Sequence, residues 1–387
     1  MTDLLIVPDR PRILVIGQDP QTLALVADEV AGCGFDVTGR APDQAEAAAG
    51  VFDLIAIGGG VAPERRAQLE ASMSARNPAA RFVSVYAPYA ASQIVAAARE
   101  PGPSPLVDLA AYLDRIGYNG PVAPTLETLR ALQAHHVAAI PFEAIDVLLD
   151  RGVDIAPAAV DAKLIAARRG GYCFEQNSLF KRVLQTIGFE VDALLASVRW
   201  NWEPGAPPPS YTHQVLRVTI DGVRWLADVG FGSSVPPAPL RLDVTDEQPT
   251  SHETYRVLPF GAGHLVQADL AGRWQSLYVV APEPLLDAHY EIPNWFTATH
   301  PSSHFRHRLI VTRAAPDARY ALLENRLTIR TPDGAVEQRE LDADGIERAL
   351  AEIFGLAPEP SWRPVLDRAA AGSAPIAATA AVGARVA

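Results

Sequence analysis

One cysteine of this chain lies in a context that suits a reactive thiol. Residues 168–177 are Arg-Arg-Gly-Gly-Tyr-Cys-Phe-Glu-Gln-Asn, so Cys173 follows a double glycine and opens a helix-like stretch that runs to Ile187. A helix N-terminus carries partial positive charge and unpaired N–H groups. Together with a nearby imidazolium, it can lower a thiol pKa from about 8.5 to about 3.5–7.5. We therefore expect Cys173 to act as a nucleophile.

A histidine and an aspartate further along are brought together by strand geometry. Asp221-Gly222 lies between two apolar runs and predicts a hairpin turn that pairs Ile220 with Val223. A slip of one residue would break up the uniformly apolar face of this register. That face contains Leu216, Val218, Ile220, Val223, Trp225, Ala227 and Val229. His213 and Asp228 then face the same way as diagonal neighbours, about 7–8 Å apart.

The three side chains together predict nucleophilic thiol catalysis. The thiolate of Cys173 would attack, His213 would move the proton, and Asp228 would fix the tautomer of the imidazole. Each residue also has a structural interpretation of its own. A lone cysteine in an apolar helical region is usually a small buried hydrophobe, which is our interpretation of Cys33. A histidine on a strand is usually structural, and an aspartate before Val-Gly-Phe-Gly can shape a turn.

Composition and charge exclude several classes of protein. Hydrophobic residues make up 49% of the 387 residues, which is enough for packed cores, while the net charge of −12 argues against binding to nucleic acid or to a membrane surface. No apolar run reaches about 18 residues, and the first residues do not form a secretory signal. Two cysteines 140 positions apart indicate free thiols in a reducing compartment, so we expect a cytoplasmic protein. No CxxC or HExxH spacing predicts a metal site.

The chain divides into regions of different periodicity. Strands alternate with helices between residues 12 and 99, which predicts a small parallel α/β layer that ends at a proline-rich linker. Residues 108–190 show helical spacing, and the period changes to two from Val191. Residues 290–356 mix both signals, and an alanine-rich tail begins at Ala369. The strands of the period-two region are expected at 191–200, 212–220, 223–231, 254–258 and 273–281.

The motifs resemble those of the arylamine N-acetyltransferase family over residues 108–365. Residues 169–177 match its nucleophile motif, and His213 and Asp228, with the segment 228–232, match the other members of its catalytic triad. Further matching segments are Tyr112-Leu-x-Arg-Ile-Gly-Tyr118, Ile140-Pro-Phe-Glu143, Asn294-Trp-Phe-Thr297 and Pro301-Ser-Ser303. Several motifs in the right order make the resemblance specific.

The resemblance implies a fold of the α+β class with a cysteine-protease-like core. A helical domain (108–190) would carry Cys173, a β-barrel (191–290) would carry His213 and Asp228, and an α/β lid (291–368) would follow. A flavodoxin-like α/β domain (1–100) and a linker (101–107) would precede them, and a disordered tail (369–387) would end the chain.

The resemblance also implies a ping-pong reaction. Acetyl-CoA, as co-substrate, acetylates Cys173, and an arylamine, arylhydrazine or arylhydroxylamine then takes the acetyl group, with no permanently bound cofactor. By analogy, Phe231 lines the acceptor pocket, and Thr212, His213, Phe296 and Ser302 contact CoA. The alternatives are core packing for the two phenylalanines and a solvated or turn hydroxyl for Thr212 and Ser302. Arg169 is interpreted as a structural cation.

Residues 12–99 are similar to a response-regulator receiver domain whose chemistry is lost. Asp19 follows Gln18 where an acidic pair is needed, the phosphoacceptor position falls near Gly58, and Tyr86 replaces a serine or threonine. The glycines at 58–60 lack the spacing of a nucleotide-binding loop. We therefore favour a degenerate interaction domain and a protein partner that binds residues 1–100.

Two other functions remain open from the sequence. An amide synthase of the same fold would close a macrolactam from a carrier-bound acyl chain and would ignore acetyl-CoA. A noncatalytic sensor would use the second unit as a ligand scaffold, and replacing Cys173 would leave it unaffected.

Overall fold

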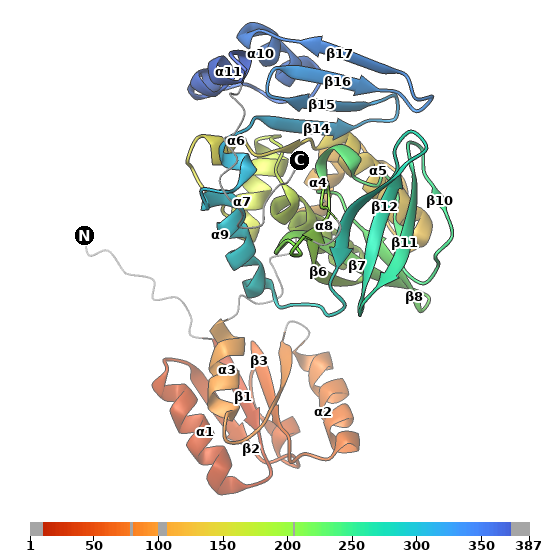
Figure 1. Cartoon of the computed structure of the whole chain (residues 1–387). Helices are drawn as coiled ribbons and strands as arrows, with labels where there is room; N and C mark the ends of the chain where they lie inside the picture. Colours follow the sequence, from red (N-terminus) through yellow and green to blue (C-terminus); the bar gives the residue numbers. More distant parts are fainter. Residues whose placement is uncertain (1–10, 78–79, 100–106, 204–205, 373–387) are drawn as a thin grey trace, which may run out of the picture. The chain divides into compact units, whose positions relative to one another are not determined.

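The computed structural model describes residues 11–77, 80–99, 107–203 and 206–372 (Figure 1). The chain forms two compact units, Met1–Pro105 and Leu106–Ala387. Residues 101–106 of the expected linker and most of the expected tail lie outside the described residues, whereas Val107, the last linker residue, is buried in the second unit. The start of the tail was placed too early, because Ala369 and Ala370 belong to the last helix and Ala369 is buried.

The first unit is a parallel four-stranded sheet with helices on both faces (Figure 1). Its strand order is β2-β1-β3-β4. Alternate side chains point to opposite faces of a strand. Leu14 and Ile16 therefore pack in one core with Leu69 of α2, whereas Ile13 and Val15 pack in a second core on the other face. The elements are β1 (Arg12–Ile16), α1 (Pro20–Gly32), β2 (Asp36–Arg40), β3 (Leu54–Gly58), α2 (Pro63–Arg76), β4 (Arg81–Val85) and α3 (Ala90–Arg99).

Two features of the first unit differ from expectation. The helix α2 was not predicted, since its sequence is mostly polar and only a few side chains, such as Leu69 and Met73, are buried. The interpretation of Cys33 as a buried hydrophobe is wrong: it follows α1 as its C-cap and is exposed.

The helical part of the second unit surrounds the nucleophile motif. The helical spacing of residues 108–190 is confirmed by helices at 109–116 and 126–139, and the expected helix begins at Cys173 and ends where Gly188 adopts a left-handed conformation with φ 103°. These helices share one hydrophobic core with the strands that follow. The elements are α4 (Leu109–Ile116), α5 (Leu126–Ala139), β5 (Phe142–Glu143), α6 (Ile145–Leu148), α7 (Pro157–Asp161) and α8 (Cys173–Ile187).

An eight-stranded antiparallel sheet follows, in the order β10-β11-β12-β13-β6-β7-β8-β9. Ile220 pairs with Val223 and Leu216 with Ala227, so the predicted hairpin register is confirmed. The two edge strands are bridged by the Gln248 side chain, which accepts from the Arg241 N–H at 2.7 Å and donates to the Arg241 carbonyl at 3.1 Å. The sheet is therefore barrel-like. Its strands are β6 (Glu190–Val198), β7 (Tyr211–Ile220), β8 (Val223–Ala227), β9 (Leu240–Arg241), β10 (Gln248–Pro249), β11 (Thr254–Phe260), β12 (Gly263–Asp269) and β13 (Trp274–Val280). The strand expected at 223–231 is shorter, since Asp228 and the residues after it leave the ladder.

The last part is a five-stranded antiparallel sheet with two helices on one face (Figure 1). Its order is β17-β16-β15-β14-β5, so the edge strand β5 comes from the helical segment. The pairing joins Phe142 to Thr312. The remaining elements are α9 (Glu291–Thr299), β14 (Ile310–Ala314), β15 (Arg319–Leu323), β16 (Arg326–Arg330), β17 (Val336–Glu340), α10 (Ala343–Glu352) and α11 (Arg363–Ala370).

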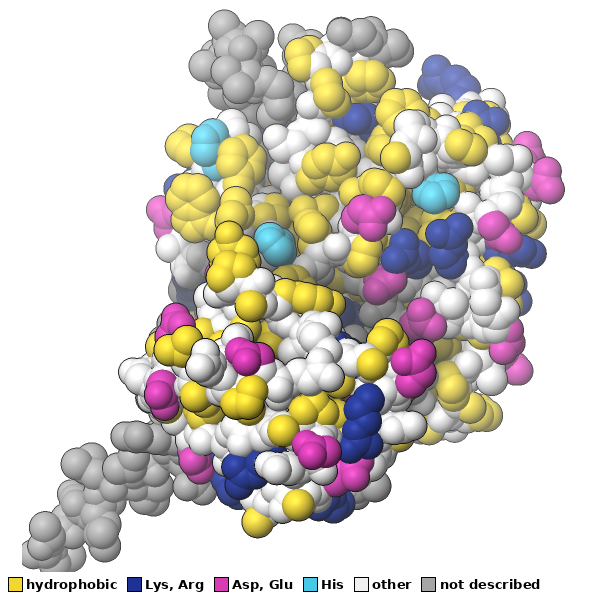
Figure 2. All heavy atoms as spheres, turned by 90° about the horizontal axis from the view of Figure 1, so that it is seen from below, with side chains coloured by type: hydrophobic (Ala, Val, Ile, Leu, Met, Phe, Trp, Pro, Cys, Tyr) yellow, Lys and Arg dark blue, Asp and Glu magenta, His cyan; other side chains and the backbone are white. Residues whose placement is uncertain are grey.

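Figure 2 shows side chains of both charge signs on the one face that it draws. On the face drawn in Figure 2, Lys and Arg side chains are interspersed with Asp and Glu side chains and with hydrophobic ones. This face therefore offers no continuous basic surface of the kind that binds nucleic acid. In the described part of the chain, no helix is both long and apolar enough to cross a membrane.

Candidate active site

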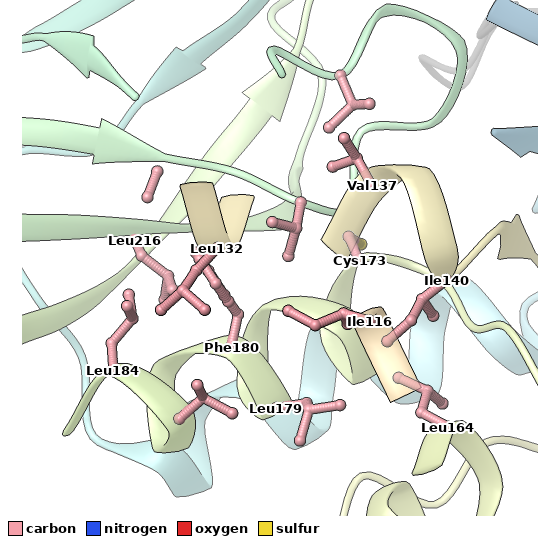
Figure 3. Packing of buried hydrophobic residues seen from close by; sticks show 14 of the residues in the cluster. Ile116, Leu132, Val137, Ile140, Leu164, Cys173, Leu179, Phe180, Leu184 and Leu216 are labelled. Atoms are coloured by element: carbon pink, nitrogen blue, oxygen red, sulfur yellow. The ribbon is translucent and has the colours of Figure 1, made fainter. Parts of the chain in front are cut away.

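Cys173 is the first residue of α8 and is 5% exposed. Figure 3 shows it beside the buried hydrophobic side chains of the helical part. The glycines around it are required by close approach of the backbone. A Cβ atom on Gly230 would lie 2.6 Å from the Cys173 Cα, and one on Gly170 would collide with the Pro141 carbonyl oxygen. Gly230 therefore lets the loop after β8 pass directly against Cys173, and Gly170 lets the turn before Cys173 pass against Pro141.

His213 and Asp228 form a buried pair next to this helix end. His213 Nε2 lies 2.7 Å from Asp228 Oδ2, and the two residues are 3% and 0% exposed. The other ring nitrogen, Nδ1, is left for the sulfur. The Cys173 Sγ contacts the Thr212 carbonyl oxygen at 3.8 Å, on the same strand as His213. Three segments far apart in sequence thus bring a thiol, an imidazole and a carboxylate together.

The electrostatics of this pair favour a charged imidazole. Burial alone would lower the pKa of His213, but the Asp228 carboxylate, with a smaller contribution from Cys173, raises it to about 10. Burial would raise the pKa of Asp228, but His213, Asn177 and the Gly230 N–H hold it below its usual value. At neutral pH the site therefore holds an imidazolium and a carboxylate.

Asn177 holds the parts of the site together, a role that the sequence reasoning missed. Its Nδ2 donates to the Gln214 carbonyl at 2.7 Å and to Asp228 Oδ1 at 3.0 Å, and its Oδ1 accepts from the Val229 N–H at 3.1 Å. Asn177 is fully buried. A signal was present, because residues four apart share a helix face and Asn177 is four residues after Cys173.

A buried ion cluster lies behind the nucleophile turn. Arg169 contacts Glu143 at 2.7 Å and Asp146 at 3.2 Å, and Lys163 contacts Asp146 and Glu175, each at 2.7 Å. The other Glu175 oxygen accepts from the Tyr172 N–H at 3.0 Å and so caps α8. The Arg169 guanidinium also lies 4.7 Å from the Trp362 ring centroid, which ties the turn to the C-terminal part.

Aromatic rings border the site, among them the predicted Phe231. The half-buried Phe231 ring lies 5.1 Å from the His213 ring and 4.8 Å from the Tyr278 ring. Tyr278 was not predicted. A second aromatic group, also missed, joins Phe305 to Phe142 at 5.8 Å. Tyr278 and Phe305 lie outside the motifs on which the prediction of the site was based.

The remaining predicted residues fall in two places. Thr212 lies on β7, with its carbonyl against the Cys173 sulfur. Phe296 and Ser302 are joined through His300, which stacks on the Phe296 ring at 4.4 Å and contacts the Ser302 hydroxyl at 2.7 Å. Within the described ranges, neither Phe296 nor Ser302 makes a hydrogen bond or ring contact with the side chains of Cys173, His213 or Asp228. No cluster of metal-binding side chains is found among the described residues.

Known proteins share this fold and this sequence. The family model described as N-acetyltransferase matches residues 125–361. The arylamine N-acetyltransferase of Mycolicibacterium smegmatis is 41% identical over 254 residues, which cover 65% of this chain and 92% of that protein. That of Escherichia coli is 40% identical, with 63% and 87% covered.

Solved structures agree with these relatives. The arylamine N-acetyltransferase structure from M. tuberculosis has a TM-score of 0.65 at 38% identity and matches 68% of this chain and all of that chain. The Mycobacterium marinum enzyme in complex with CoA has the same TM-score and identity and matches 68% and 99%. This chain therefore belongs to the arylamine N-acetyltransferase family. The family model leaves residues 1–124 unmatched.

Proposed function

We propose that this protein moves an acetyl group from acetyl-CoA, through Cys173, to an arylamine, arylhydrazine or arylhydroxylamine. The observation that carries the proposal is the buried His213–Asp228 pair beside the first residue of α8, in a chain of this family. The relatives in M. smegmatis and E. coli are arylamine N-acetyltransferases, which favours acetyl transfer over the amide synthase alternative.

The first half of the reaction forms a thioester on the enzyme. The Cys173 sulfur, which lies beside the imidazolium of His213 at the N-terminus of α8, attacks the acetyl carbonyl carbon of acetyl-CoA. The bond between that carbon and the CoA sulfur breaks, and His213 gives its proton to the leaving thiolate. Asp228 holds the ring with Nδ1 towards the sulfur throughout.

The second half transfers the acetyl group to nitrogen. The acceptor amine attacks the acetyl carbonyl, His213 takes the amine proton, and the Cys173 thiolate leaves. Arylamines are weak bases and so are neutral and nucleophilic at pH 7, whereas alkylamines are mostly protonated. We assign Phe231 to the acceptor pocket, and Thr212, His213, Phe296 and Ser302 to CoA contacts. No permanently bound cofactor is needed for these steps.

We infer that the core of the second unit is cysteine-protease-like and divides into a helical domain, a barrel domain and a lid near residues 190 and 290. The support is that Cys173 comes from a helix and His213 from a barrel-like sheet. We also infer a cytoplasmic location, because both cysteines are free thiols.

We infer that the first unit is a flavodoxin-like, degenerate receiver domain that binds a protein partner through residues 1–100. Its strand order, β2-β1-β3-β4, is that of the flavodoxin-like pattern without a fifth strand. Asp19 is engaged as the N-cap of α1, since its side chain accepts from the Thr22 N–H at 2.8 Å.

Mass spectrometry of the intact protein after addition of acetyl-CoA tests the function. The expected result is a gain of one acetyl group that is lost when 4-aminobenzoate is added. The Cys173→Ala variant is the control and should gain none. An unmodified wild-type protein that instead accepts a long acyl thioester would favour the amide synthase.

A further inference from the structure

Arg199, just after β6, is a buried guanidinium without a counter-ion. The residue is 6% exposed. Its Nη1 donates to the Ser197 hydroxyl at 3.0 Å, and its guanidinium lies 4.9 Å from the Trp202 ring centroid. Its buried Nε has no hydrogen-bond partner in the described part of the chain, and no described carboxylate lies within salt-bridge distance of it.

The other buried arginines of the described ranges are all compensated. Arg169, Arg182 and Arg319 each pair with a carboxylate, at 2.7, 2.5 and 2.6 Å. Arg115 has no carboxylate but donates to four backbone carbonyls. Arg199 alone among the five combines burial with a single hydrogen bond, to a neutral hydroxyl.

Such a charge is costly unless something pairs with it. Transfer of a charged side chain into a protein interior is strongly unfavourable without a partner, and a guanidinium matches the two oxygens of a carboxylate or phosphate. In keeping with this, burial lowers the pKa of Arg199, with only a smaller opposing effect from Tyr211. A buried guanidinium with one neutral hydrogen-bond partner has the donors that an anion would satisfy.

Arg199 lies close in the fold to the strand that contacts Cys173. In the ladder between β6 and β7, Ala196 pairs with His213 and Ser197 with Tyr211. Ser197, the hydrogen-bond partner of Arg199, therefore lies opposite the start of β7, next to Thr212, whose carbonyl contacts the Cys173 sulfur. Arg199 thus borders the same end of the barrel-like sheet as the nucleophile.

We propose that Arg199 binds an anionic group of a substrate, either a phosphate of the acyl donor or a carboxylate of the acceptor amine. This inference rests on the proposed function, because it takes the substrates from it. The Trp202 ring lies against the guanidinium, and Nε is a donor that neither Ser197 nor any other described group satisfies.

The Arg199→Gln variant separates the two sources of the anion. Its rate of Cys173 acetylation is measured with acetyl-CoA and with S-acetyl-N-acetylcysteamine, a thioester without phosphates. Its acetylated form is then treated with 4-aminobenzoate and with 4-methylaniline, which has no carboxylate. Loss of a charge-assisted contact is expected to lower one of these rates about 10- to 100-fold. If Arg199 binds a phosphate of the donor, only the acetylation rate with acetyl-CoA falls. If it binds the carboxylate of the acceptor, only the transfer rate to 4-aminobenzoate falls.

Arg256→Gln is the matched control. Arg256 also stacks on a tryptophan, 4.1 Å from the Trp274 centroid, and also bonds a neutral side chain, Gln267, at 2.8 Å, but it is only half-buried. This variant should leave all four rates unchanged. Thermal unfolding supplies a second readout, because removing an uncompensated buried charge should leave the Tm of Arg199→Gln unchanged or raised, whereas a structural arginine would lower it.

The affinities of the protein for CoA and for 4-aminobenzoate, measured by calorimetry, test the role of Arg199 without any acetyl transfer. Arg199→Gln should weaken one of the two affinities about tenfold. Unchanged affinity for both, or equal loss of rate with the neutral and the anionic substrates, would overturn the assignment. A wild-type protein that binds CoA but takes up no acetyl group would refute the proposed function and leave the Arg199 site to be decided by the binding data.

Discussion

Charge, and not exposure, should decide which of the two thiols reacts. Cys33 is exposed whereas Cys173 is buried beside the imidazolium of His213. At pH 6 that imidazolium and the α8 N-terminus place positive charge beside the Cys173 sulfur, which favours its attack as a nucleophile. We expect iodoacetamide to label Cys173 much faster than Cys33, as followed by peptide mass spectrometry. The Asp228→Asn variant should lose most of this advantage, and faster labelling of Cys33 in the wild-type protein would contradict the expected role of His213.

The same pair predicts how stability depends on pH. The pKa of His213 rises from 6.5 to about 10 on folding. Its contribution to the stability of the folded protein is therefore fully present below about pH 6.5 and is lost as pH rises through 10. The pKa of Asp228 is lowered, so its contribution is present above 3.8, its unfolded value, and is lost in acid. Urea unfolding of wild type and Asp228→Asn should therefore differ more at pH 6 than at pH 10. If the difference in unfolding free energy between the two proteins were larger at pH 10 than at pH 6, His213 would be neutral in the folded protein.

At the scale of elements, the contact between α8 and the loop after β8 positions the nucleophile. A methyl group at residue 230 would lie 2.6 Å from the Cys173 Cα and would push α8 away from His213. A displacement of about 1 Å can cost about 100-fold in rate. We expect Gly230→Ala to lower the rate of Cys173 acetylation by about that factor.

The matched control for this variant is Gly32→Ala. A Cβ atom on Gly32 meets nothing within 4 Å, so no loss is expected there. If Gly230→Ala kept the wild-type rate, the close approach of the loop would have no part in placing the sulfur.

The elements also show which parts of the fold a sequence reveals. The β7–β8 register followed from the Asp221-Gly222 turn and one apolar face, both of which are local. The pairing of β5 with β14 joins Phe142 to Thr312, and no local pattern specifies so distant a partner. The proximity of His213 and Asp228 was predictable for the same reason as the hairpin, whereas the contacts of Asn177, Tyr278 and Phe305 exist only in the folded chain.

At the scale of the whole molecule, the two units should be separable in function. The match to the M. smegmatis relative covers 92% of that protein but only 65% of this chain. A fragment that begins at Leu106 should therefore keep kcat/KM for acetyl-CoA and 4-aminobenzoate within about twofold of the full chain. A large loss in a fragment that still unfolds cooperatively would show that the first unit contributes to catalysis.

The dipeptide Phe142–Glu143 serves two neighbours at once. It forms the edge strand β5 against β14, and the Glu143 N–H donates to the Gly171 carbonyl at 3.1 Å, two residues before the nucleophile. An outward rotation of the five-stranded sheet would carry β5 with it and would break the hydrogen bond between Glu143 and Gly171. The turn that positions the Cys173 sulfur would then lose its support. Substrates must therefore reach the thiol with that sheet in place, and heat should melt all of residues 107–372 in one cooperative step.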